Sequence, residues 1–95
     1  MELEKLRIFL AVAETENISA AARKLFVSHS TVSRAVAALE KELECELVVH
    51  GINRTEELTE AGMMLKDGAV KILCEANALR EQIKLVGTKD KKQDE

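Results

Sequence analysis

The chain has 95 residues, 46% of them hydrophobic, with two phenylalanines as its only aromatic residues and no proline, which indicates one small, mainly helical domain. No apolar run approaches the ~20 residues that cross a bilayer, and charges stand where a signal peptide has its apolar stretch, so we expect a cytoplasmic protein without membrane contact. The formal net charge of −3 excludes an overall basic surface for nucleic acid and leaves room only for a local one.

Two helices are predicted in the first quarter of the chain. Apolar residues from Leu3 onward recur in steps of three and four, which predicts an amphipathic helix that ends near residues 15–17. Ser19 is in a suitable position to be the N-cap of a second, short helix over about Ala20–Leu25. Residues 26–28 are then expected to form a tight turn.

A third helix follows, with Ser28 or Ser30 as its N-cap, and runs to about Leu43. On a helical wheel its apolar residues share one face, which is expected to pack in the core. This core face consists of Val32, Val36, Leu39 and Leu43, with Ala35 at its edge. The opposite face carries Ser30, Arg34, Ala37 and Lys41, flanked by Thr31 and Ser33. Two short helices whose second member opens with hydroxyls and an arginine are typical of a helix-turn-helix that reads DNA.

The middle of the chain predicts a β-hairpin. Residues 47–50 and 54–58 flank Gly51-Ile52-Asn53, a Gly and Asn turn next to β-branched residues. This pattern favours a short hairpin of the kind called a wing.

A long fourth helix is expected from its N-cap Thr59 to about Val86, ending at Gly87 after about 40 Å. The polar residues 88–95 are expected to be disordered. The predicted organisation is therefore a winged helix-turn-helix DNA-binding domain over residues 1–58, a linker and dimerisation helix over 59–87, and a charged tail over 88–95.

Apolar residues of the fourth helix advance in alternating steps of four and three, the heptad pattern of a coiled coil. We call this stripe the heptad seam; it consists of Leu65, Ala69, Ile72, Ala76, Leu79, Ile83 and Val86. The seam could pack on the chain's own domain. Because most of the helix extends beyond what a domain of this size covers, a homodimer interface is favoured.

The remaining residues give no sign of catalysis. The sequence contains no Gly-rich phosphate loop, no His or Cys cluster with metal-ligand spacing and no acid and base pair in a plausible pocket, so neither an enzyme nor a bound cofactor is expected. Cys45 and Cys74 are interpreted as buried small hydrophobic residues rather than as a disulfide or zinc site.

Several short motifs occur in order along the chain. They are Leu6-x-x-Phe9 with Ala11-Val12-Ala13-Glu14, Ser19-x-x-Ala22, Leu25, Val27-Ser28, Val32-Ser33-Arg34, Leu39-Glu40-x-x-Leu43, Leu47, and Leu58-Thr59-x-Ala61-Gly62. In order and spacing they resemble the N-terminal DNA-binding domain and linker helix of LysR-type transcriptional regulators, over about residues 1–86. The resemblance implies a winged helix-turn-helix that dimerises through the long helix and sets two recognition helices into the major grooves of a near-palindromic operator.

The resemblance also implies positions that contact DNA. Carried over residue by residue, these are Ser19, Ser28, His29, Ser30, Thr31, Ser33, Arg34 and Arg54. Ser19 would touch the phosphate backbone, Arg54 would lie near the minor groove, and the others would contact bases and phosphates. Ala37 and His50 depart from the family pattern, because arginine is frequent at both positions. Their loss as phosphate contacts predicts weaker discrimination against non-specific DNA.

In the family, an effector-sensing domain follows the linker helix. The chain of 95 residues contains no such domain, so it is either part of a longer regulator or a stand-alone domain. This polypeptide alone is expected to bind no small-molecule inducer. The alternative function is a protein-interaction module that forms mixed dimers with a full-length regulator.

Overall fold

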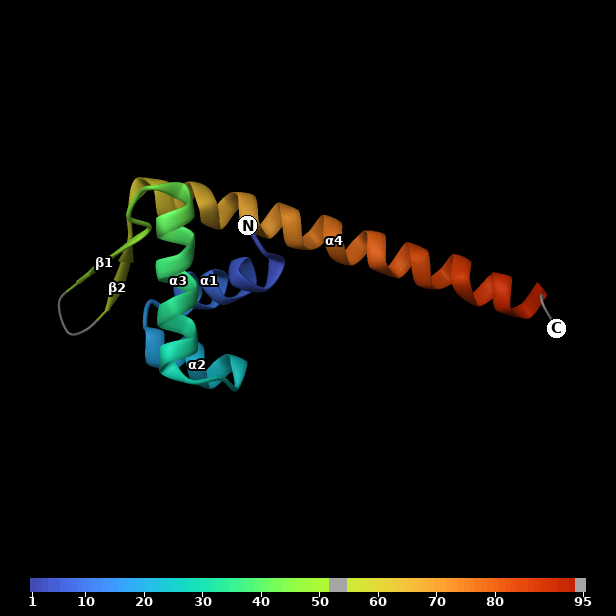
Figure 1. The fold of residues 1–95 in the computed structure, drawn as a ribbon, viewed down its shortest axis with the longest axis horizontal. Helices are drawn as coiled ribbons and strands as arrows, with labels where there is room; N and C mark the ends of the chain where they lie inside the picture. Colours follow the sequence, from blue (N-terminus) through green and yellow to red (C-terminus); the bar gives the residue numbers. More distant parts are fainter. Residues whose placement is uncertain (52–54, 94–95) are drawn as a thin grey trace.

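A computed structural model describes the backbone of residues 1–51 and 55–93, and the side chains of these residues up to Thr88. The elements in chain order are α1 (Leu3–Thr15), α2 (Ile18–Leu25), α3 (His29–Leu43), β1 (Val48–His50), β2 (Glu56–Leu58) and α4 (Glu60–Gln93). Figure 1 shows α1, α2 and α3 gathered at one end, with the hairpin beside α3 and most of α4 projecting away from them. The expected mainly helical architecture with one hairpin is therefore observed.

Side-chain caps define where α2 and α3 begin. The Asn17 Oδ1 atom accepts a hydrogen bond from the Ala20 N–H group at 2.8 Å. The expected cap at Ser19 is therefore wrong: α2 begins earlier because Asn17, an equally good capping residue, stands nearer the end of α1. Ser28 caps α3, since its Oγ accepts from the Thr31 N–H group at 3.1 Å.

The turns after α1, α2 and α3 share one backbone conformation. Each helix ends on a residue in the left-handed region: Glu16 (φ 56°), Phe26 (φ 58°) and Glu44 (φ 55°). Glycine normally occupies this position, because a side chain there is strained. The tight connections therefore rest on three residues in a conformation that is unfavourable for them.

The core consists of two clusters that share α1. Val12, Ala21 and Val32 belong to the cluster that joins α1, α2 and α3. Phe9 and Leu39 belong to the second cluster, which joins α1 and α3 to the start of β1 and the first turns of α4. α1 thus contacts both the helix-turn-helix and the first turns of α4.

The core face expected for the third helix is observed, with one exception. Val32, Ala35, Val36 and Leu39 are buried. Leu43 is 38% exposed because it is the last residue of α3 and lies at the edge of the domain.

The hairpin is antiparallel, with Val48 paired to Leu58 and His50 paired to Glu56, as the wing prediction requires. Backbone contacts fix it to the rest of the domain. The Glu56 N–H group donates to the Glu16 carbonyl at 2.7 Å, and the Thr59 N–H group donates to the Leu47 carbonyl at 3.0 Å. The hairpin is therefore held at both its α1 side and its α4 side.

Thr59 caps α4 as predicted, since its Oγ1 accepts from the Gly62 N–H group at 3.0 Å. The predicted end at Gly87 is wrong, because α4 continues through this residue to Gln93. A glycine inside a helix costs only about 1 kcal/mol and does not by itself end it. The expected disordered tail is thus helical up to Gln93, and residues 94–95 lie outside the described part.

Two further observations concern the surface. Cys45 and Cys74 are free and exposed, so their interpretation as buried residues is wrong. Within the described residues, no helix is long and apolar enough to cross a membrane.

Candidate nucleic-acid interface

The N-terminus of α3 presents a cluster of hydroxyl groups. The Ser28 Oγ atom lies 2.8 Å from the Thr31 Oγ1 atom and 3.4 Å from the Ser30 Oγ atom. Ser28, His29 and Ser30 are exposed, and Thr31 is half-buried. Hydroxyls and free N–H groups at a helix N-terminus suit both phosphate oxygens and the edges of bases.

Arg34 lies one turn further along α3 and is exposed. Its Nε atom donates to the Ser30 carbonyl at 3.2 Å, which orients the guanidinium along the helix. A guanidinium has five N–H donors, so four remain for an external acceptor.

The residues of α3 divide between two grooves. Thr31 and Arg34 line a groove toward α1, together with Glu2 and Lys5. Ser33 lines a groove toward the hairpin, together with Ala37, Val48 and His50. The exposed face of α3 is therefore a ridge that would present different side chains to the two sides of a bound duplex.

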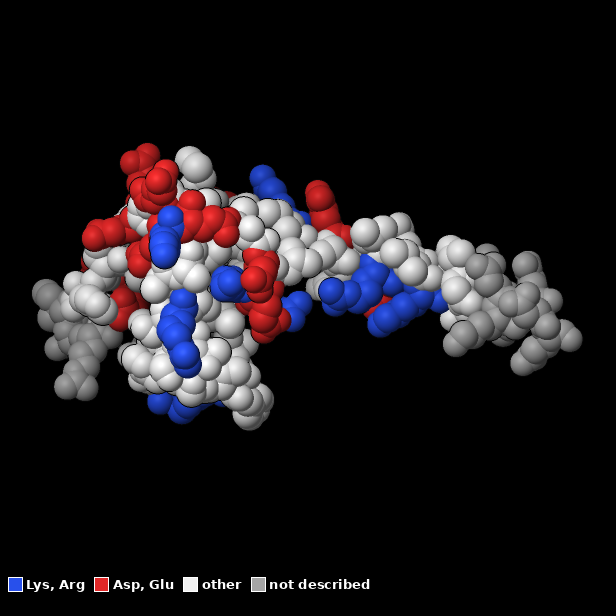
Figure 2. Space-filling view, in the orientation of Figure 1, with Lys and Arg blue, Asp and Glu red and all other residues white. Residues whose placement is uncertain are grey.

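Charge on this side of the molecule is unevenly distributed. Figure 2 shows Lys and Arg along the front of α3, whereas Asp and Glu gather around its C-terminal end and the hairpin. Lys24 pairs with Glu14 at 2.7 Å, which removes one cation from the local balance. Arg34 has no carboxylate within ion-pair distance among residues 1–51 and 55–88. The positive charge available to a ligand is therefore local, as the net charge requires.

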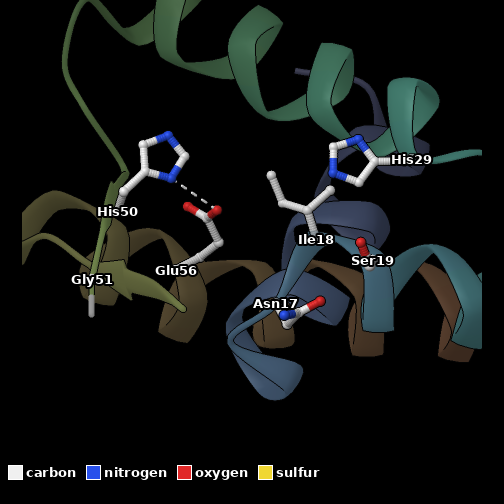
Figure 3. Close-up of a pocket in the computed structure, with 7 residues that line it drawn as sticks. All are labelled: Asn17, Ile18, Ser19, His29, His50, Gly51 and Glu56. Atoms are coloured by element: carbon white, nitrogen blue, oxygen red, sulfur yellow. Dashed lines mark hydrogen bonds and ion pairs between the residues drawn. The ribbon is translucent and has the colours of Figure 1, made fainter. Parts of the chain in front are cut away.

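A cavity of about 400 Å³ lies between the N-terminal ends of α2 and α3 and the hairpin (Figure 3). Its lining residues are Asn17, Ile18, Ser19, His29, His50, Gly51 and Glu56. The His50 Nδ1 atom lies 3.1 Å from the Glu56 Oε1 atom. We call this cavity the wing pocket.

The wing pocket brings together Ser19 and His29, which the resemblance assigned to DNA contact. Asn17 and Glu56 are members of this site that sequence reasoning missed. Glu56 shares a face of β2 with the half-buried Leu58, because residues two apart in a strand point to the same side. The remaining expected position, Arg54, lies outside the described residues.

The heptad seam is divided by the fold. Ala69 is fully buried in the core, so its assignment to a dimer interface is wrong: the first turns of α4 pack on α1. Leu65 and Ala76 are half-buried, and Leu65 packs against the same core cluster. The other members are exposed: Ile72 (38%), Leu79 (58%), Ile83 (61%) and Val86 (58%).

Known proteins resemble this chain in sequence. The model of the family "Bacterial regulatory helix-turn-helix protein, lysR family" matches residues 3–63. The regulator ClcR of Pseudomonas putida is 42% identical over 73 residues, which are 77% of this chain and 24% of ClcR. The regulator IlvY of Escherichia coli is 41% identical over 83 residues, which are 87% of this chain and 28% of IlvY. The chain thus spans about a quarter of the length of these relatives.

Solved structures resemble it in fold. A CbnR DNA-binding domain, solved in complex with DNA, superposes with a TM-score of 0.86 at 36% identity, covering 92% of this chain and 99% of that domain. A BenM DNA-binding domain in complex with catB site 1 DNA also gives 0.86, at 31% identity, with 92% and 96% covered. The expected winged helix-turn-helix fold is confirmed, and the chain belongs to the LysR family of bacterial regulatory helix-turn-helix proteins.

Proposed function

We propose that the chain is the sequence-specific DNA-binding part of a transcriptional regulator and binds a near-palindromic, double-stranded operator as a homodimer. The domain over residues 1–58 contacts the DNA, and the linker helix over residues 59–87 joins the two copies through its exposed part. One observation carries the proposal: the exposed hydroxyl cluster and Arg34 stand on α3 of a fold that matches DNA-bound domains over 92% of the chain. The proposed activity is binding rather than catalysis, needs no cofactor, and takes place in the cytoplasm, where bacterial DNA lies.

The proposed contacts follow from the position of each side chain. In α3 and its N-cap, bases and phosphates are contacted by Ser28, His29, Ser30, Thr31, Ser33 and Arg34. Ser19, exposed in the first turn of α2, contacts the phosphate backbone. Arg54 in the wing is proposed to reach the minor groove. Phosphate contacts set the orientation, and the side chains on α3 select the sequence.

The proposed dimer contact is the exposed part of the heptad seam. Leu79, Ile83 and Val86 are each more than half exposed and lie beyond the domain's own core. They line one shallow groove with Gln82 and Gly87. An apolar stripe at heptad spacing gains most free energy by packing against a second copy of itself.

A second candidate function rests on the same stripe. A dimerisation module could pair with a full-length regulator through α4 and form mixed dimers. This candidate requires the exposed seam but does not require the hydroxyl cluster or Arg34. A variant that no longer binds DNA distinguishes the two functions, because it would lose the first and keep the second.

The test is selection of bound duplexes from a random pool, followed by fluorescence anisotropy with the selected duplex. We expect one recurring near-palindromic sequence and an affinity that falls steeply as salt rises. Arg34→Ala should weaken binding markedly, whereas Arg80→Ala, a change on the exposed part of α4, should not. The proposal fails if no sequence is enriched, or if binding is indifferent to both salt and Arg34→Ala.

A further inference from the structure

Glu56 is a buried carboxylate without an evident structural role. Its residue is 5% exposed, and its Oε2 atom is buried without a hydrogen-bond partner among the described residues. An unsatisfied buried acceptor lowers stability, and a charged one does so more strongly. Glu40 differs, because its carboxylate accepts from backbone N–H groups. The described contact of the Glu56 side chain is the His50 ring.

His50 connects this buried carboxylate to the surface. Its Nδ1 atom lies 3.1 Å from the Glu56 Oε1 atom, while its side chain is 84% exposed. In Figure 3 the second ring nitrogen of His50 points away from Glu56. The imidazole thus has one edge on a buried anion and the other edge available to a ligand.

Several hydrogen-bond donors also line the wing pocket. Ser19 in the first turn of α2 and His29 at the first position of α3 bring two helix N-termini to the same cavity. The Asn17 Oδ1 atom is used in capping, and its amide group still provides N–H donors. Helix N-termini, hydroxyls and amide donors favour phosphate.

We propose that the wing pocket holds a backbone phosphate of bound DNA, and that His50 contacts this phosphate only when both of its ring nitrogens are protonated. The inference rests on the proposed DNA-binding function. Glu56 acts as a positioning residue: its carboxylate accepts a hydrogen bond from the Nδ1–H group and so leaves Nε2 to face the phosphate. A neutral ring held this way presents a lone pair, which repels phosphate. Where the ring is neutral in the free protein, binding takes up one proton, which moves from solvent to Nε2.

The acidic groups around His50 make phosphate binding depend more strongly on the protonation of its ring. The His50 and Glu56 pair carries a charge of −1 when the ring is neutral and 0 when it is protonated. Other groups face the same region: His29 from α3, Glu40 and Glu46 in the adjoining groove, and the Glu57 carboxylate close to Gly51. Because most of these groups are acidic, a phosphate is repelled unless His50 carries its proton.

The test measures duplex affinity across a salt series at about pH 6 and about pH 8, which bracket the range in which histidine changes charge. The probe is the duplex selected from the random pool. We expect the wild-type affinity to fall about tenfold from the lower to the higher pH. At the lower pH the slope of log K against log salt should be steeper by about 0.9, the value for one more neutralised phosphate.

Three variants assign the effect. His50→Gln should remove both pH effects. His29→Gln changes the other histidine of the wing pocket and should keep the ratio of the affinities at the two pH values, even where its own contact with DNA is lost. Glu56→Gln should bind several-fold more tightly than wild type at the higher pH, because it removes the buried charge. Circular dichroism checks that each variant is folded, and the exposed His50→Gln change keeps the test valid if Glu56→Gln does not fold.

Distinct results overturn distinct claims. Equal salt slopes at both pH values in the wild type, or a pH effect lost in His29→Gln instead, would overturn the role of His50. Unchanged affinity of folded Glu56→Gln at the higher pH would overturn the claim that the buried charge of Glu56 repels the phosphate. Absence of duplex binding at either pH would overturn the proposed function itself and this inference with it.

Discussion

The Glu40 carboxylate of α3 accepts a hydrogen bond from the backbone N–H group of Leu47 at 2.8 Å, and so ties the end of the recognition helix to the first strand of the hairpin. The same Oε2 atom lies 3.4 Å from the Val48 nitrogen. This contact lies directly before β1, so it fixes the position of the hairpin, and with it the wing pocket, relative to α3.

Glu40→Ala removes this acceptor and should lower the free energy of unfolding by about 1–3 kcal/mol, because a part-buried N–H group loses its partner. Urea denaturation followed by circular dichroism measures the change. Glu75→Ala, at an exposed position on α4, is the control and should stay within about 0.5 kcal/mol of wild type. Equal stability of the two variants would show that the carboxylate does not hold the hairpin.

The left-handed turn after α3 gives a second prediction. Glu44 has φ 55°, a conformation that costs a side chain about 1–2 kcal/mol and glycine almost nothing. Glu44→Gly should therefore raise the free energy of unfolding by about 1 kcal/mol. Glu42→Gly, two residues earlier inside α3, is the matched control and should lower it by about 1 kcal/mol. Destabilisation by both variants would contradict the account of the turn.

Most of the fold was predictable from local patterns. Apolar spacing located α1 and α3, and residue type indicated the cap at Thr59 and, as one of two candidates, the cap at Ser28. The errors at Ser19 and Gly87 were local, whereas the error at Ala69 depends on neighbours that are distant in sequence. Ala69 is buried because α4 crosses α1, and no pattern within α4 distinguishes it from the exposed Ile72.

The site was predictable in part. Hydroxyls and an arginine at the start of α3 are a local signal, so Ser28 and Arg34 could be named from the sequence. The wing pocket could not, because it forms only when the hairpin folds back over the N-terminus of α2. Its buried Glu56 occupies an inward position of a short strand, where an apolar residue is the ordinary expectation.

The exposed half of the heptad seam predicts the oligomeric state. Leu79→Glu combined with Ile83→Glu should convert a dimer at micromolar concentration into a monomer, because it places four like charges in one apolar interface. Multi-angle light scattering measures the mass. Leu85→Glu is the control: this residue is 68% exposed but lies on the other side of α4 from Ile83, so the dimer should persist. A monomeric wild type would contradict the homodimer.

Two neighbouring residues of α3 should act on DNA in different ways. Arg34, with free N–H donors beside the hydroxyl cluster, is charged, whereas Ser33 is a neutral hydroxyl in the groove toward the hairpin. Arg34→Ala removes a cation, so the slope of log K against log salt should become shallower by about 0.9 if Arg34 contacts a phosphate. Ser33→Ala should leave the slope unchanged and alter only the preference among bases, since a hydroxyl releases no counterion.

Anisotropy across a salt series, with the selected duplex and single-base variants of it, measures both effects. A shallower slope for Ser33→Ala, or an unchanged slope for Arg34→Ala together with lost base preference, would exchange the two roles and place the phosphate contact on the hairpin side of α3.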